Sequence, residues 1–155
     1  GIRASVLRLT NTYGPGMRVK DARQTFLGIW VRQLLEGKPI KVFNFGKMQR
    51  DFTYIDNVIQ ANLAACLAPK TACGKVVNIA CGERVSLLDI LEIVYGLAGK
   101  RVPPKFEPGR VGDVRDSLAD ISLARNLIGY DPKVPFAKGL AQTFDWFKSA
   151  EPGRS

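Results

Sequence analysis

Two short apolar runs limit the possible folds of this chain more than any other feature. SVLRL occupies residues 5–9 and KVVNIA residues 75–80, and a turn containing glycine follows each run. Such runs predict β-strands. Most other stretches have apolar residues at helical spacing, at 22–37, 57–68, 86–99, 120–129 and 136–150. Alternating strands and helices predict an α/β fold. Only two strands fit a parallel sheet, which is typical of one part of a larger architecture.

Shorter signals refine this division. The alternating run PIKVFNF, residues 39–45, predicts a further strand, and the proline-rich, basic residues 100–112 predict a loop. Ser86 and Asp89 have the spacing of a capping box and predict the start of a helix. Asp56 is predicted to cap the helix that follows it.

The composition predicts one ordinary globular unit in the cytoplasm. The chain has 155 residues, enough for a single domain with a core. No apolar run approaches the ~20 residues of a membrane helix, so no membrane association is expected. The three cysteines lack CxxC spacing, which favours reduced thiols and a cytoplasmic location.

The charge points to an anionic partner of small size. Lys and Arg number 23 against 14 Asp and Glu, a formal net charge of +9, but they are scattered along the chain. Nucleic-acid-binding proteins concentrate this charge on one face, so a nucleic-acid partner is the less favoured alternative. The sequence has no histidine, which excludes Ser-His and Cys-His nucleophile pairs and the commonest metal ligand. With no CxxC motif either, no metal site is expected.

Five motifs in order carry a family resemblance: RLTNTYGPG, KVFNFGKMQRDFTYIDNVIQANLAA, VVNIACGERVSL, RVGDVRDSLADISLARNLIGYDP and GLAQTFDWF. Together they resemble the C-terminal half of NAD-dependent sugar-nucleotide epimerases and dehydratases, which are extended short-chain dehydrogenases. UDP-glucose 4-epimerases and UDP-glucuronate decarboxylases look most similar. The resemblance implies that residues 1–15 and 52–82 belong with a Rossmann domain. Residues 16–51 and 83–150 then form the substrate-binding part.

Two features of the family are absent from the sequence. Its members bind NAD through a glycine-rich turn near the N-terminus, and no such run is present. Their catalytic base is a Tyr followed four residues later by Lys, and none of the four tyrosines has that Lys. We therefore expect NAD in the intact enzyme, no tightly bound cofactor on this chain, and no activity from the chain alone. A fragment of a full enzyme is favoured, partly because the chain opens directly at a strand; a stand-alone, non-catalytic nucleotide-sugar-binding module is the alternative.

By resemblance, three polar residues contact the diphosphate of a nucleotide sugar: Asn11, Arg50 and Arg110. An amide donates to phosphate without adding charge, and the planar guanidinium makes paired bonds. Asn11 could instead be a simple turn residue. Arg50 could instead form an ion pair with Asp51 or Asp56.

The resemblance assigns the remaining site residues to the nucleoside and the cofactor. Asp113 would accept hydrogen bonds from the ribose hydroxyls, with a basic surface loop as the alternative. Val42 and Phe43 belong to the stretch whose backbone and ring hold the base, and a plain core strand is the alternative. Thr12 and Arg23 resemble positions that touch NAD, although Arg23 could equally be a solvated helix charge.

An oligomer is also expected. In the family, the strands matching 5–9 and 75–80 have neighbours from the first half of the enzyme. Without those neighbours the strand edges stay open, and an open edge is a template for another chain. We therefore expect a dimer or larger species that forms through residues 1–15 or 75–82.

Overall fold

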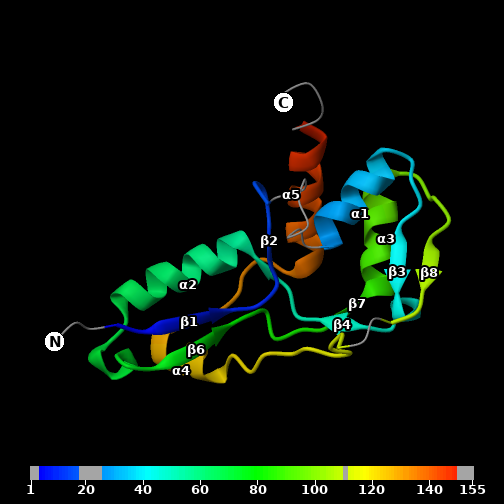
Figure 1. The fold of residues 1–155 in the computed structure, drawn as a ribbon. Helices are drawn as coiled ribbons and strands as arrows, with labels where there is room; N and C mark the ends of the chain where they lie inside the picture. Colours follow the sequence, from blue (N-terminus) through cyan, green and yellow to red (C-terminus); the bar gives the residue numbers. More distant parts are fainter. Residues whose placement is uncertain (1–3, 18–25, 110–111, 150–155) are drawn as a thin grey trace.

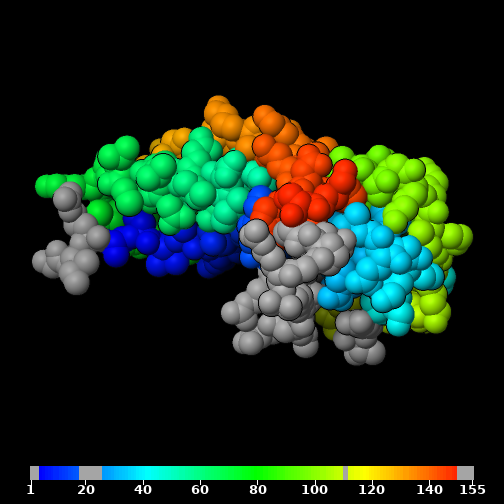
Figure 2. Space-filling view, turned by 90° about the horizontal axis from the view of Figure 1, so that it is seen from above, coloured from blue at the N-terminus to red at the C-terminus, as the bar shows by residue number. Residues whose placement is uncertain are grey.

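The computed structural model describes residues 4–17, 26–109 and 112–149 and confirms the α/β fold class. The elements form two lobes side by side (Figure 1). One lobe contains β1, β6, α2 and α4. The other contains α1, α3, α5, β3 and β8, and short strands connect the two lobes. In the view from above, α2 and β1 lie side by side in the first lobe, and α5 lies between α2 and α1 (Figure 2).

The first lobe is built on the two predicted strands. β1, Val6–Leu9, and β6, Val76–Ile79, pair in parallel as expected, with Val6 opposite Val76. The helices α2, Ile55–Leu67, and α4, Ser122–Ile128, pack with the pair around a core that includes Val77. On the strand pair, 56% of Val6 and 45% of Val76 are exposed. Apolar surface therefore remains uncovered on this lobe.

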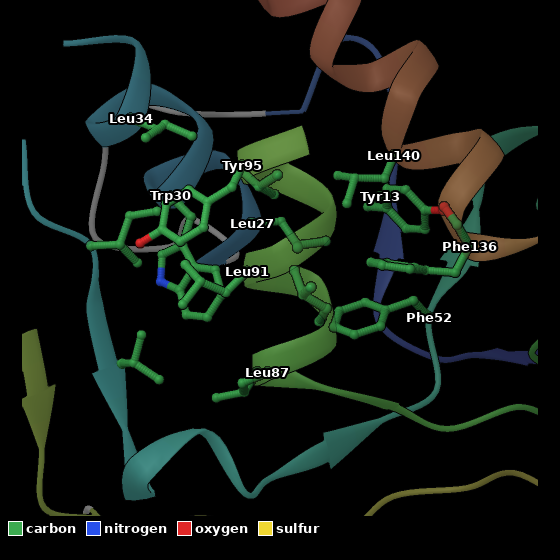
Figure 3. Packing of buried hydrophobic residues seen from close by; sticks show 14 of the residues in the cluster. Tyr13, Leu27, Trp30, Leu34, Phe52, Leu87, Leu91, Tyr95, Phe136 and Leu140 are labelled. Carbon is green, nitrogen blue, oxygen red and sulfur yellow. The ribbon is translucent and has the colours of Figure 1, made fainter. Parts of the chain in front are cut away.

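The second lobe is a three-helix cluster. The helices α1, Phe26–Leu35, α3, Leu87–Ala98, and α5, Phe136–Ser149, contact one another. Figure 3 shows their side chains packed together with Tyr13 and Phe52, which come from the connection between the lobes. These helices follow the predicted apolar spacing.

The sequence did not predict several short strands. β2, Thr12–Tyr13, pairs in parallel with β5, Thr53–Tyr54, whereas β4, Gln49–Arg50, pairs antiparallel with β7, Val85–Ser86. Strands of two residues are too short to show alternation, so the sequence contained no signal for them.

The structure corrects two predictions about the strand pair β3 and β8. The expected strand 39–45 is only β3, Lys41–Phe43, because Asn44 and Phe45 adopt positive φ values of 49° and 51° and begin a 3-10 turn, Asn44–Gly46. The expected loop 100–112 contains β8, Lys105–Glu107, which pairs in parallel with β3. The view that only two strands pair in parallel is therefore wrong.

Helix starts were predicted with mixed success. The capping box is confirmed: the Asp89 N–H donates to Ser86 Oγ at 3.1 Å, and the Ser86 N–H donates to Asp89 Oδ2 at 3.2 Å. The predicted cap at Asp56 is wrong, because α2 begins at Ile55 and Asp56 lies inside its first turn. There its negative charge still stabilises the positive end of the helix dipole.

No helix in the described part of the chain combines the length and the apolar character that a membrane crossing requires.

Candidate functional site

A groove at the junction of the two lobes is formed by two adjoining cavities. The first, here called the apolar cavity, measures about 510 Å³ and is lined by Phe26, Trp30 and Phe43 among others. The second, here called the polar cavity, measures about 690 Å³ and is lined by polar residues that include Asn11. Arg50 and Asp113 line both cavities. The groove therefore has an aromatic end and a polar end that meet at a guanidinium and a carboxylate.

Arg50 is held in place by backbone carbonyls. Its Nη1 donates to the carbonyls of Gln49 at 2.8 Å and Arg115 at 3.0 Å, and its Nη2 lies 3.6 Å from Met48 Sδ. A guanidinium has five N–H donors, more than these contacts use. The carboxylate of Asp51 accepts backbone N–H groups instead of forming an ion pair with Arg50. The ion-pair alternative with Asp51 therefore does not describe this residue.

Asn11 lies at the end of β1 and is exposed. Its Nδ2 donates to the Asp51 carbonyl at 2.8 Å, and its own carbonyl accepts the Thr53 N–H at 3.3 Å. One donor of the amide is thus used inside the fold, which agrees in part with the turn-residue alternative. The side-chain amide has a second N–H. Asn11 lines the same polar cavity as Arg50.

Of the three residues expected to contact the nucleoside, two line the groove and one is buried in the core. Asp113 is exposed in the groove, and Phe43 is half-buried along the apolar cavity. Val42 is fully buried in the core at 0% exposure and lines neither cavity, which agrees with the alternative of a plain core strand. At the aromatic end, Trp30 Nε1 donates to the Lys41 carbonyl at 3.1 Å and ties α1 to β3.

Of the two expected cofactor residues, the structure describes only Thr12. Thr12 lines neither cavity, and its Oγ1 donates to the Thr10 carbonyl at 3.3 Å. Arg23 and Arg110 lie outside the described residues.

Sequence reasoning missed several groove residues. Trp30, Gln33 and Met48 line the apolar cavity, and Lys41 lies at its edge. The helical spacing around Trp30 marked that face as core and gave no sign of a cavity beside it. Asp51 was considered only as an ion-pair partner, yet it is nearly fully buried at the polar end. Its only sequence signal was a carboxylate placed among aromatic and β-branched residues.

Burial keeps the Cys81 thiol and the Tyr13 and Tyr130 hydroxyls in their protonated forms at neutral pH. Burial raises the pKa of the Cys81 thiol to about 11 and also raises the pKa of Tyr13 and Tyr130 well above the ordinary tyrosine value. A base or nucleophile at neutral pH needs the opposite shift. These three groups are therefore unsuited to act as a base or nucleophile at neutral pH.

The fold and groove define an α/β protein with a polar and aromatic groove at the junction of two lobes. The model of the NAD dependent epimerase/dehydratase family matches residues 1–80, and the chain belongs to this family. UDP-glucuronate 4-epimerase of Thermodesulfobacterium geofontis is 32% identical over 149 residues, which cover 96% of this chain and 44% of the relative.

Two solved structures share the fold. UDP-glucose 4-epimerase of Thermotoga maritima with UDP-glucose has a TM-score of 0.88 at 30% identity, covering 96% of this chain and 47% of that one. UDP-glucuronic acid 4-epimerase of Bacillus cereus with UDP-glucuronic acid and NAD has a TM-score of 0.85 at 35% identity, covering 95% and 46%. The chain thus spans about half the length of the relatives it matches.

Proposed function

We propose that this chain is the nucleotide-sugar-binding part of an NAD-dependent sugar-nucleotide epimerase or dehydratase, with a UDP-sugar-like ligand. The observation that carries the proposal is the convergence of Asn11, Arg50 and Asp113 on one groove. Solved relatives of the same fold are described with UDP-glucose or UDP-glucuronic acid. On its own, the chain binds the ligand without turning it over.

The chemistry of the groove matches the parts of such a ligand. The Arg50 guanidinium, oriented by two carbonyls, would bind the diphosphate, and the remaining N–H of Asn11 would assist it. Asp113 would accept hydrogen bonds from the ribose. The apolar cavity beside Phe43 and Trp30 would receive the planar base.

The sequence has no glycine-rich turn for NAD, and the hydroxyl of Thr12 donates to the carbonyl of Thr10, two residues earlier. No hydride-transfer step is therefore assigned to this chain. We propose that a separate NAD-binding half supplies the cofactor and the catalytic base, since the matched relatives are about twice as long.

The lobes support the proposed division of the chain in part. β1, α2 and β6 form the lobe assigned to a Rossmann domain, and α1, β3 and α3 form the substrate-binding lobe. α4 packs against β6 and α2, so the later part of residues 83–150 shares a core with the first lobe. The free cysteines are in keeping with a cytoplasmic location.

Calorimetric titration with UDP tests the proposal. Arg50→Ala removes a charge-assisted bond worth roughly 1.5–3 kcal/mol, so the affinity should fall by about one to two orders of magnitude. Arg101→Ala is the matched control, because Arg101 lies on the same lobe in an exposed ion pair with Glu92. Exposed pairs contribute little, so the control should bind UDP normally.

Equal UDP binding by the unmodified chain and Arg50→Ala would show that the diphosphate site lies elsewhere. Tighter binding to DNA than to UDP at physiological salt would favour the nucleic-acid alternative.

A further inference from the structure

Among the described residues, Asp51 is the only charged side chain that the fold buries, with 1% exposed. It lies between β4 and β5, directly after Arg50. A buried carboxylate is costly unless hydrogen bonds replace its lost hydration. The partners of Asp51 therefore indicate what this side chain does.

Those partners come from segments that are distant in sequence. Asp51 Oδ1 accepts the N–H of Cys81 at 3.0 Å, and Oδ2 accepts the N–H groups of Gly82 at 3.1 Å and Ala119 at 3.3 Å. Its backbone carbonyl also accepts from Asn11 Nδ2 at 2.8 Å. One residue thus connects the end of β1, the turn after β6 and the segment that ends at Ala119.

These segments form the polar end of the groove. Asn11, Asp51, Asp113 and Ala119 all line the polar cavity. The segment from 112 to 119 also supplies the Arg115 carbonyl that orients the Arg50 guanidinium at 3.0 Å. A shift of this segment would therefore move the carboxylate of Asp113 and one support of Arg50 together.

We propose that Asp51 is a positioning residue of the nucleotide-sugar groove. Its carboxylate holds the turn after β6 and the 112–119 segment, its carbonyl holds Asn11, and the ligand-facing groups are thereby kept on one groove. The inference rests on the proposed function. Asp51 acts through its neighbours because its carboxylate faces three backbone N–H groups.

Asp51→Asn is the test variant, because it keeps the shape of the side chain. It replaces one acceptor oxygen by an NH₂ group, so at least one of the three N–H groups faces another donor. Thr143→Ala is the control. Thr143 is also 1% exposed, and its Oγ1 donates to the Gly139 carbonyl at 2.7 Å inside α5, outside either cavity of the groove.

Three measurements are made on both variants and the unmodified chain: melting temperature, UDP affinity by calorimetry, and amide hydrogen exchange by NMR. In Asp51→Asn, the amides of Cys81, Gly82 and Ala119 should exchange about tenfold faster or more, and UDP affinity should fall by about tenfold. Thr143→Ala should lower the melting temperature, because it leaves a small cavity in the core, while its UDP affinity stays within about twofold of the unmodified chain.

Two results would overturn the inference while leaving the proposed function intact. The first is unchanged UDP affinity in Asp51→Asn when the unmodified chain binds UDP. The second is an equal loss of affinity in Thr143→Ala, which would reduce Asp51 to a general contributor to stability. If the unmodified chain binds no UDP, the proposed function fails; amide exchange then decides, and unchanged exchange at the three amides overturns the positioning role.

Ala119→Pro covers the case in which Asp51→Asn does not fold. It removes one of the three N–H donors and leaves the Asp51 carboxylate in place. UDP affinity should fall in the same direction, by less than in Asp51→Asn. Unchanged affinity in a folded Ala119→Pro, together with unchanged exchange at Cys81 and Gly82, would contradict the inference.

Discussion

Replacing Gly139 with alanine should destabilise the junction between the two lobes. Gly139 lies inside α5 where the helix passes close to two buried tyrosines. A Cβ at this position would lie 2.5 Å from Tyr13 Oη and 2.7 Å from Tyr54 Cδ2. Real Cβ atoms do not approach other atoms so closely, so the rings or the helix must move.

The size of the effect follows from opposing contributions. Overpacking a core costs typically about 1–3 kcal/mol. The Tyr13 hydroxyl also donates to the Phe136 carbonyl at 2.9 Å, and losing that bond would add about 1 kcal/mol. Alanine in place of a helical glycine returns about 1 kcal/mol. The free energy of unfolding should therefore fall by about 1–3 kcal/mol.

Urea unfolding measures the free energy of unfolding of Gly139→Ala and of a control variant, Gly96→Ala. Gly96 also lies inside a helix, α3, but a Cβ there meets nothing within 4 Å. Gly96→Ala should therefore raise the free energy of unfolding by about 0.5–1 kcal/mol. If Gly139→Ala is as stable as Gly96→Ala, the close packing of α5 on the tyrosines is wrong.

Three further results are expected. Ser86→Ala should lower the free energy of unfolding by about 1 kcal/mol in the same urea assay, because it removes the hydroxyl of the capping box; no loss would mean that the box contributes nothing. At pH 8, iodoacetamide followed by peptide mass spectrometry should modify the exposed Cys66 and spare Cys81, whose thiolate forms only as the pH rises toward its raised pKa of about 11; rapid modification of Cys81 would contradict this. Sedimentation equilibrium at micromolar concentration should show a dimer or larger species, because in the described part of the chain β1 pairs with β6 alone; a stable monomer would show that the open strands need no partner.

Local signals in the sequence predicted the helices and the two longest strands. The capping box at Ser86 was predictable because both of its members lie within one turn of helix. The cap was wrongly predicted at Asp56 because Asp is favourable both at a helix cap and inside the first turn. Strands as short as Gln49–Arg50 depend on pairing with distant segments and leave no periodic pattern.

The groove was harder to predict than the helices. Asn11, Arg50 and Asp113 were singled out by resemblance, and the fold brings them to one groove, although what they bind stays a proposal. Asp51 could not have been recognised, because its partners Cys81, Gly82 and Ala119 lie 30, 31 and 68 residues away in the sequence. Such contacts are set by the tertiary fold and have no local signature.

An NMR titration of the chain with UDP tests the central claim most directly. The backbone amide signals of Asn11, Phe43, Arg50 and Asp113 should shift together and saturate with one affinity, while the signals of Val6 and other residues far from the groove stay in place. Saturable shifts confined to β1 and β6, or no saturable shifts at all, would contradict the assignment of this groove as the nucleotide-sugar site.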